Sequence, residues 1–266
     1  MEAAKSMITK PKNFDDDNLS YMKPRINKRG GKNVNITYNS NKLVFQFPNI
    51  TTWGLNERVD EDTGRVSYDI NLQFPVRGED AAADTFLDAI KACENKVLDD
   101  SVTNSKAWFG KNKMSREVSE NLMYPMLRYP KNKETGELDY TRSPTLKMKL
   151  SYWDDKFTVE LYNKQKELVF NPKEHSALEL MELVPSRASL KGLIECGGLW
   201  FVGGRFGVTW RLLQAQVETP VTIKGFCMLD DSDDDSSDDA AAAAPSPKKK
   251  KQVRRKKKKA PAASED

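Results

Sequence analysis

Apolar and polar residues alternate along much of the chain, which is the pattern of strands that bury one face and expose the other. The clearest case is residues 65–74, whose apolar face holds Val66, Tyr68, Ile70 and Leu72. Pro75 ends this strand, because proline cannot donate a backbone hydrogen bond to a sheet. The same pattern predicts strands at 34–38, 43–47, 145–153, 157–161, 168–170, 189–195, 199–202 and 205–217.

Between these strands the period of the apolar residues changes from two to about 3.6. Residues 80–98 place apolar side chains at helical spacing, with acidic residues early and Lys91 and Lys96 late, as the helix dipole favours. This predicts an amphipathic helix packed across the sheet. A shorter helix is expected at 115–123, with Ser115 as its N-cap.

Short turn motifs join the predicted strands. The Asn-Ser-Asn sequence at 39–41 predicts a hairpin between the first two strands. The glycine pairs at 197–198 and 203–204 predict turns between the last three. Several short strands, one packed amphipathic helix and a long final strand predict a mainly β (α+β) fold, an elaborated oligonucleotide-binding (OB-like) Greek-key barrel. A β-sandwich is the alternative.

Composition divides the chain into three parts. Residues 1–30 are polar without periodicity and predict an irregular arm, and residues 31–229 carry the predicted barrel. The tail, 230–266, has seven Asp among three Ser at 230–239 and a basic block at 248–259, so it cannot bury apolar area and is expected to be disordered. The net charge is only +4, so binding of nucleic acid would depend on where the charges lie.

Several functional classes find no support in the sequence. Cys93, Cys196 and Cys227 are far apart and form no CxxC pair, which indicates neither a zinc site nor a disulfide framework. No signal-peptide pattern and no apolar run approaching roughly 20 residues occurs, so we expect a soluble, intracellular protein in a reducing compartment. His175, the only histidine, has no triad or ligand motif around it, and no cofactor motif is present. We therefore expect no enzyme, no cofactor and no metal.

The stretch from Ser105 to Trp153 interleaves cations with large aromatic rings. A groove for single-stranded nucleic acid needs both, because cations follow the phosphates while rings stack on unpaired bases. The Tyr-Pro pairs at 124–125 and 129–130 favour extended backbone, which exposes the rings. The predicted nucleic-acid-binding residues are Lys106, Trp108, Phe109, Lys111, Lys113, Arg116, Tyr124, Arg128, Tyr129, Arg142, Lys147 and Lys149.

An alternative for the same stretch is a surface loop whose rings turn back into the core, since aromatic residues are often buried. Trp200, Phe201 and Trp210 look apolar on the closing hairpin, and we assign them to the core. Trp53 is compatible with either role. Replacement of Trp108 by alanine separates the two alternatives, because a stacking ring affects binding and a core ring affects stability.

Four segments of the chain carry a family likeness. They are LVFQFPNITTWG (43–54), SKAWFGKNK (105–113), LKMKLSYWDDKFTVEL (146–161) and GLIECGGLWFVGGRFGVTWRLLQAQV (192–217). They resemble the single-stranded DNA-binding protein of nucleocytoplasmic large DNA viruses, which is similar to that of short-tailed coliphages. The resemblance implies an OB barrel that coats unwound viral DNA, with an acidic tail that contacts polymerase or helicase. The basic block at 248–259 departs from this pattern, because it would neutralise the acidic tract in cis.

We therefore predict a sequence-independent single-stranded DNA-binding protein of viral DNA replication, recombination or repair. Its expected partners are single-stranded DNA and, through Asp230–Asp239, replication proteins, and a homodimer is compatible with the sequence. The basic block suits either a nuclear localisation signal or a nucleic-acid contact, and the expected location is the host nucleus or a viral replication site. The alternatives are a packaging protein that binds DNA through its basic tail, and an RNA-binding module.

Overall fold

The structure, a computed structural model, describes residues 5–27, 30–154, 156–174, 176–220 and 228. It divides the chain into two units, Met1–Val221 and Thr222–Asp266, and the helices and strands below all belong to the first. The acidic tract at 230–239, the basic block at 248–259 and His175 lie outside the described residues.

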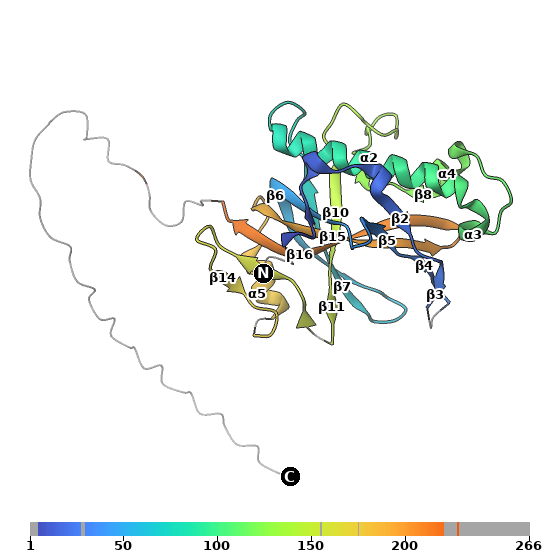
Figure 1. Ribbon diagram of the computed structural model, residues 1–266. Coiled ribbons are helices and arrows are strands. Elements are labelled where there is room, and N and C mark those ends of the chain that lie inside the picture. The colour runs from blue at the N-terminus through green and yellow to red at the C-terminus, as the bar shows by residue number, and fades with distance from the viewer. Residues whose placement is uncertain (1–4, 28–29, 155, 175, 221–227, 229–266) are drawn as a thin grey trace, which may run out of the picture. The chain divides into compact units, whose positions relative to one another are not determined.

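Five long strands close into a barrel (Figure 1). In chain order they are β6 (Val44–Val59), β7 (Val66–Gln73), β10 (Thr145–Leu150), β15 (Ser189–Val202) and β16 (Arg205–Glu218). β6 pairs with β7, and β7 pairs with β10, both antiparallel. β10 pairs in parallel with β16, β16 pairs with β15, and β15 pairs with β6, which closes the barrel. This closed Greek-key order of five strands confirms the predicted OB-like barrel.

The period-two pattern explains the interior of the barrel. The predicted apolar face of β7 is buried apart from Val66, and Leu146 and Met148 of β10 are fully buried beside it. Helix α2 (Ala81–Thr103) runs across the strands at the top of Figure 1 and places Phe86 against Phe45 and Phe47. The Asp80 side chain caps this helix, which therefore begins where the sequence predicted but continues one turn further.

Shorter elements surround the barrel. They are β1 (Ile8–Thr9), η1 (Pro11–Asn13), η2 (Asp16–Asn18), β2 (Leu19–Tyr21), β3 (Arg25–Ile26), β4 (Lys32–Val34), β5 (Ile36–Tyr38), α3 (Ser105–Phe109), α4 (Arg116–Leu122), β8 (Met123–Tyr124), β9 (Leu127–Arg128), β11 (Tyr152–Trp153), β12 (Lys156–Phe157), β13 (Glu160–Tyr162), β14 (Leu168–Phe170) and α5 (Ala177–Leu183). Ser115 caps α4 as predicted. Among the described residues, no helix is both long and apolar enough to span a membrane.

The predicted hairpin at 34–47 is wrong, although its turn exists. Tyr38 and Asn41 exchange backbone hydrogen bonds, and Asn39 and Ser40 take positive φ angles, as a tight turn requires. The flanking strands then separate, because β5 pairs with β2 and β6 pairs with β15 and β7. Alternation predicts which face of a strand is buried, but it does not identify the neighbouring strand.

Two further expectations need correction. The Gly197-Gly198 pair is a bulge inside the continuous strand β15, and not a turn. Gly198 has φ +87°, and a Cβ there would lie 2.5 Å from the Val34 carbonyl oxygen, so only glycine fits. Residues 5–27 form short strands and 3-10 helices, and they pack on the barrel, since β1 pairs with β6 and Leu19 is buried.

Candidate nucleic-acid interface

The outer face of β7 and β10 carries polar side chains in register. Thr145 lies opposite Gln73, Lys147 opposite Asn71, and Lys149 opposite Asp69. The neighbouring strand β16 adds Arg211 beside Lys149. In OB barrels the face of the second and third strands is the surface that binds oligonucleotides. The two lysines predicted from the sequence therefore lie where this fold binds its ligands.

Helix α2 positions residues 123–130 beside this face. The half-buried Glu94 carboxylate accepts the backbone N–H of Met126, and desolvation raises the pKa of Glu94. Met126 and Leu127 are buried, so Tyr124 and Arg128 on either side of them point outward. Short pairings hold both ends, Tyr124 to β16 and Arg128 to β10.

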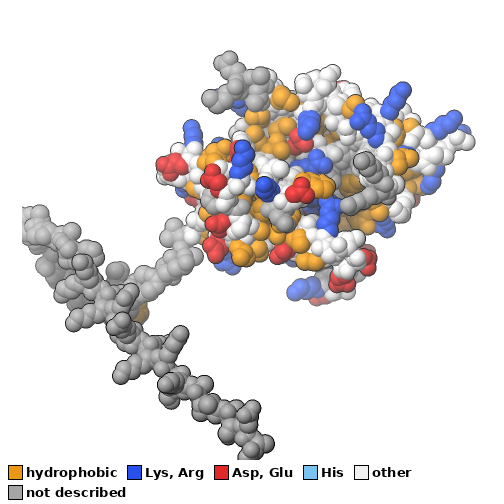
Figure 2. Space-filling model, turned by 90° about the horizontal axis from the view of Figure 1, so that it is seen from below, with side chains coloured by type: hydrophobic (Ala, Val, Ile, Leu, Met, Phe, Trp, Pro, Cys, Tyr) orange, Lys and Arg blue, Asp and Glu red, His pale blue; other side chains and the backbone are white. Residues whose placement is uncertain are grey.

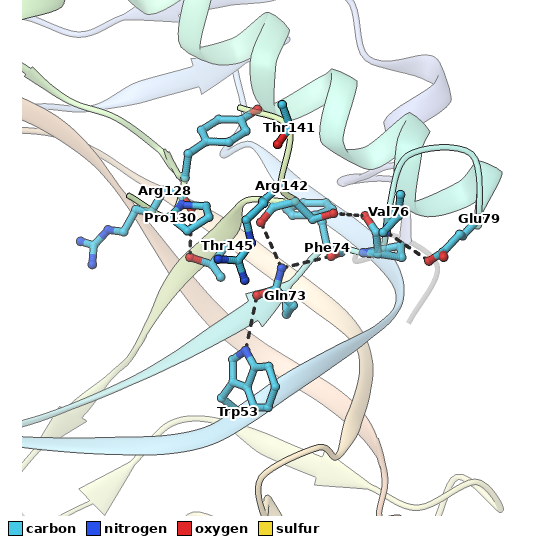
Figure 3. Close-up of a pocket in the computed structure, with 13 residues that line it drawn as sticks. Trp53, Gln73, Phe74, Val76, Glu79, Arg128, Pro130, Thr141, Arg142 and Thr145 are labelled. Atoms are coloured by element: carbon cyan, nitrogen blue, oxygen red, sulfur yellow. Dashed lines mark hydrogen bonds between the residues drawn. The ribbon is translucent and has the colours of Figure 1, made fainter. Parts of the chain in front are cut away.

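A first hollow, of about 630 Å³, lies at one end of this face (Figure 3). Trp53 borders it from the strand side, and its Nε1–H donates to Gln73 Oε1 at 3.4 Å. Arg142 points toward Gln73 from the facing loop, and Arg128 borders the hollow at its edge. Tyr129 is half-buried in the wall. The hollow thus combines an exposed indole with two guanidinium groups.

A second hollow, of about 240 Å³, lies along β10 and the β15–β16 hairpin. Its lining includes Lys147 and Lys149, and the rings of Tyr124 and Trp200 lie 5.3 Å apart at its end. The guanidinium of Arg205 lies 5.3 Å from the centre of the Tyr124 ring, within reach of a cation–π contact. We call the two hollows together the groove.

The two hollows of the groove adjoin at Arg128, which lines both. The groove therefore begins at Trp53 and ends at the Tyr124–Trp200 pair, with cations between the two groups of rings. Figure 2, a view of the molecule from below, shows lysine and arginine side chains interspersed with apolar ones. They are prominent toward the side where Figure 1 places α3 and β4.

The groove cations are not equivalent. Lys147 Nζ lies 2.5 Å from a carboxylate oxygen of the buried Asp69, which also accepts from Arg58 Nε at 2.8 Å. The Lys149 ammonium forms no ion pair with a carboxylate of the described residues. Desolvation of that ammonium lowers the pKa of Lys149, and the cations Lys147, Arg211 and Arg65 lower it further, although part of the side chain is exposed. An anion bound beside Lys149 would relieve this repulsion.

No family model and no curated protein matches this chain. Among solved structures, the chain is similar to the single-stranded DNA-binding protein of bacteriophage Enc34 in complex with single-stranded DNA, with 12% identity and a TM-score of 0.41 over 77% of this chain and 98% of that one. It is also similar to gp2.5, a single-stranded DNA-binding protein encoded by bacteriophage T7, with 14% identity and a TM-score of 0.42 over 70% of this chain and 91% of that one.

Half of the residues predicted from the sequence line the groove. They are Tyr124, Arg128, Tyr129, Arg142, Lys147 and Lys149. The other six precede them, on α3, on α4 and in the loop between these helices, and they line neither hollow. They are Lys106, Trp108, Phe109, Lys111, Lys113 and Arg116.

A stacking role for Trp108 is wrong. Its side chain is only 3% exposed, and its ring makes an edge contact with Tyr21 at 4.9 Å, so it presents no face to a base. Phe109 is half-buried against Phe206, with ring centres 5.1 Å apart. Arg116 is held by Asp99, Asn95 and Glu120. For Trp108 and Phe109, the alternative in which the rings turn back into the core is the correct one.

Two groove rings were not among the predicted residues. Trp53 was compatible with either role, and its side chain is 53% exposed. Trp200 was assigned to the core together with Trp210, which is indeed buried. The glycine at 207 is a sequence signal for the position of the Trp200 ring. Gly207 lies opposite Trp200, and a Cβ there would be 2.7 Å from the indole. The glycine leaves room for a ring that lies across the strand.

No histidine or cysteine is among the described residues that line the groove. In the part of the chain that the structure describes, no group of three or more His, Cys, Asp or Glu side chains is placed to hold a metal ion. Cys93 and Cys196 are both buried, and burial raises the pKa of each thiol, which keeps it protonated. The groove presents cationic and aromatic side chains to a ligand.

Proposed function

We propose that the chain binds single-stranded DNA in the groove, without regard to base sequence. The observation that supports this most is the position of the rings, which stand at both ends of a cationic path on the ligand-binding face of an OB barrel. Cations along the path suit the phosphates, and rings at its ends suit bases. Ring stacking accepts any base, since every base has a π-face.

The groove favours single strands over duplexes for a structural reason. Trp53 and the Tyr124–Trp200 pair offer apolar surface that only an unstacked base can cover. The faces of paired bases are already covered by their neighbours in the duplex. Lys149 and Arg128 attract both kinds of nucleic acid, but the rings contribute free energy of binding only for the unpaired one.

We further propose that this activity serves viral DNA replication, recombination or repair, at a viral replication site or in the host nucleus. Support comes from the resemblance of the four segments described above to viral single-stranded DNA-binding proteins. Replication proteins and a second copy of the chain are proposed partners on the same ground. The basic block is proposed to direct nuclear entry or to contact nucleic acid.

The proposal is tested by alanine substitution of the rings at each end of the groove. Trp53→Ala and Tyr124→Ala should each weaken binding of labelled oligo(dT) by about 1 to 3 kcal/mol, measured by fluorescence anisotropy. Trp153→Ala is a matched control, because Trp153 is also exposed but lines neither hollow. Equal affinities of all three variants and the unchanged chain would refute the groove. Parallel titrations with oligo(U) determine whether the groove prefers DNA to RNA.

A further inference from the structure

A second basic surface lies on parts of β6, β15 and β16 that do not line the groove. Two hollows, of about 420 and 350 Å³, adjoin at Gln46 on β6 and Lys191 on β15. They share no lining residue with the groove, which is built on β7, β10, β8 and the tip of the β15–β16 hairpin. We call these two hollows the second face.

The charge of the second face is of one sign. Its charged lining residues are Lys10, Lys12, Lys166 and Lys191, and no carboxylate lines either hollow. All four lysines are exposed, and none forms an ion pair with another described residue. Four ammonium groups that line two adjoining hollows make the local potential positive, so an anionic partner would lower their electrostatic free energy.

Neutral donors stand between these lysines. Gln46 and Gln214 flank Leu193 in one row across three strands, and Gln216 lies opposite Lys191 in the next. A Cβ at Gly192 would lie 2.3 Å from the Gln214 carbonyl oxygen, so glycine lets β15 approach β16 closely at this point. Glutamine amides and lysine ammonium groups are typical donors to the phosphate oxygens of nucleic acid.

The second face offers no stacking platform comparable to the groove. Two aromatic residues are among those that line it. Phe47 is fully buried, and Tyr162 is half-buried, with its hydroxyl donating to Glu160 at 2.8 Å. A surface with donors but without exposed rings recognises the backbone of a nucleic acid and not its bases.

We propose that the second face binds the sugar–phosphate backbone of a further segment of nucleic acid, single- or double-stranded, while the groove holds an unpaired strand. One chain would thereby contact two segments at once. The two surfaces differ in what they require, since the groove needs unpaired bases and the second face needs only phosphates.

The test compares three double variants of the full chain, each of which loses two cations. Lys166→Gln with Lys191→Gln alters the second face, Arg128→Gln with Lys149→Gln alters the groove, and Lys23→Gln with Lys173→Gln is the control for net charge. Lys23 and Lys173 are exposed and line none of the four hollows. Each protein is titrated with a labelled duplex and with oligo(dT) across a salt series, and tryptophan quenching reports on the groove.

The second-face variant should bind the duplex about tenfold to a hundredfold more weakly at 0.1 M salt, with the slope of log K against log salt reduced by about 1.8. Its affinity for oligo(dT), measured by quenching, should stay within about twofold of the unchanged chain, whereas the groove variant should lose more affinity for oligo(dT) than for the duplex.

The proposal is overturned if duplex affinity is unchanged in the second-face variant, or falls as far in the charge control. It is also overturned if polyglutamate binds the second face but DNA does not, which would assign the surface to an acidic protein segment. Failure of the groove is a separate result, in which oligo(dT) quenching is absent from every protein while duplex binding still depends on Lys166 and Lys191.

Discussion

The two parts of the basic aromatic stretch have similar compositions and different roles. In residues 105–116, Trp108 is buried, Phe109 packs against the hairpin, and Arg116 is held by side chains of α2 and α4. In residues 124–149, six rings and cations line the groove, whereas Tyr140, Lys131 and Lys133 line neither hollow. Both parts interleave cations with rings, so the interleaving itself does not distinguish a core segment from a binding segment. The distinction comes from which other apolar side chains lie within reach.

The largest expected effect is on stability, in the first part. Trp108→Ala removes a fully packed indole and should lower the free energy of unfolding by about 3 to 5 kcal/mol. Urea denaturation measures this loss. At temperatures where the variant is folded, its affinity for oligo(dT) should stay within about twofold of the unchanged chain, because the ring faces no ligand.

Trp53→Ala should have the opposite effect, with weaker binding of oligo(dT) and little loss of stability. Trp53 is more than half exposed, so its loss should change the free energy of unfolding by no more than about 0.5 kcal/mol. If Trp108→Ala weakened binding as strongly as Trp53→Ala while remaining fully stable, the contrast between the two parts of the stretch would be wrong.

A smaller effect is expected from a groove cation. Arg128 lines both hollows, so Arg128→Gln should remove about one phosphate contact. The slope of log K against log salt for oligo(dT) should fall by about 0.7, and the affinity at 0.1 M salt by about fivefold. Lys113→Gln, in the loop before α4, is the matched control and should leave the slope unchanged. A reduced slope in both variants would mean that the segment around α3 also contacts DNA.

The pH dependence of binding tests whether Lys149 contacts a phosphate of the bound strand. Desolvation and neighbouring cations lower its pKa in the free protein, and a bound phosphate would raise it again. The charged form therefore binds more tightly, so affinity is full below the lowered pKa and falls as the pH rises through it, by about fivefold for one phosphate contact. Lys149→Arg should remove this alkaline loss, because the guanidinium stays protonated. An identical pH profile in the variant would assign the loss to another group.

Much of the fold follows from local pattern, and much of the groove does not. The period-two faces of β7 and β10 and the start of α2 near residue 80 depend on neighbouring residues, and each is found as predicted. Trp200 joins the groove only because Gly207 leaves space for it and segment 123–124 pairs with β16 beside it. These contacts join residues far apart in the chain, which a local reading of one sequence does not capture.

The smallest expected effect concerns Arg116, whose charge resembles that of Arg128 in the sequence. Its guanidinium is already engaged by Asp99 and Glu120, which raise its pKa, and all three side chains are substantially exposed. Exposed ion pairs of this kind contribute no more than about 1 kcal/mol, because solvent screens them. Arg116→Gln should therefore cost at most this much in urea denaturation and leave the salt dependence of oligo(dT) binding unchanged. A fall in the salt slope equal to that of Arg128→Gln would show that DNA displaces these carboxylates, and the groove would then extend onto α4.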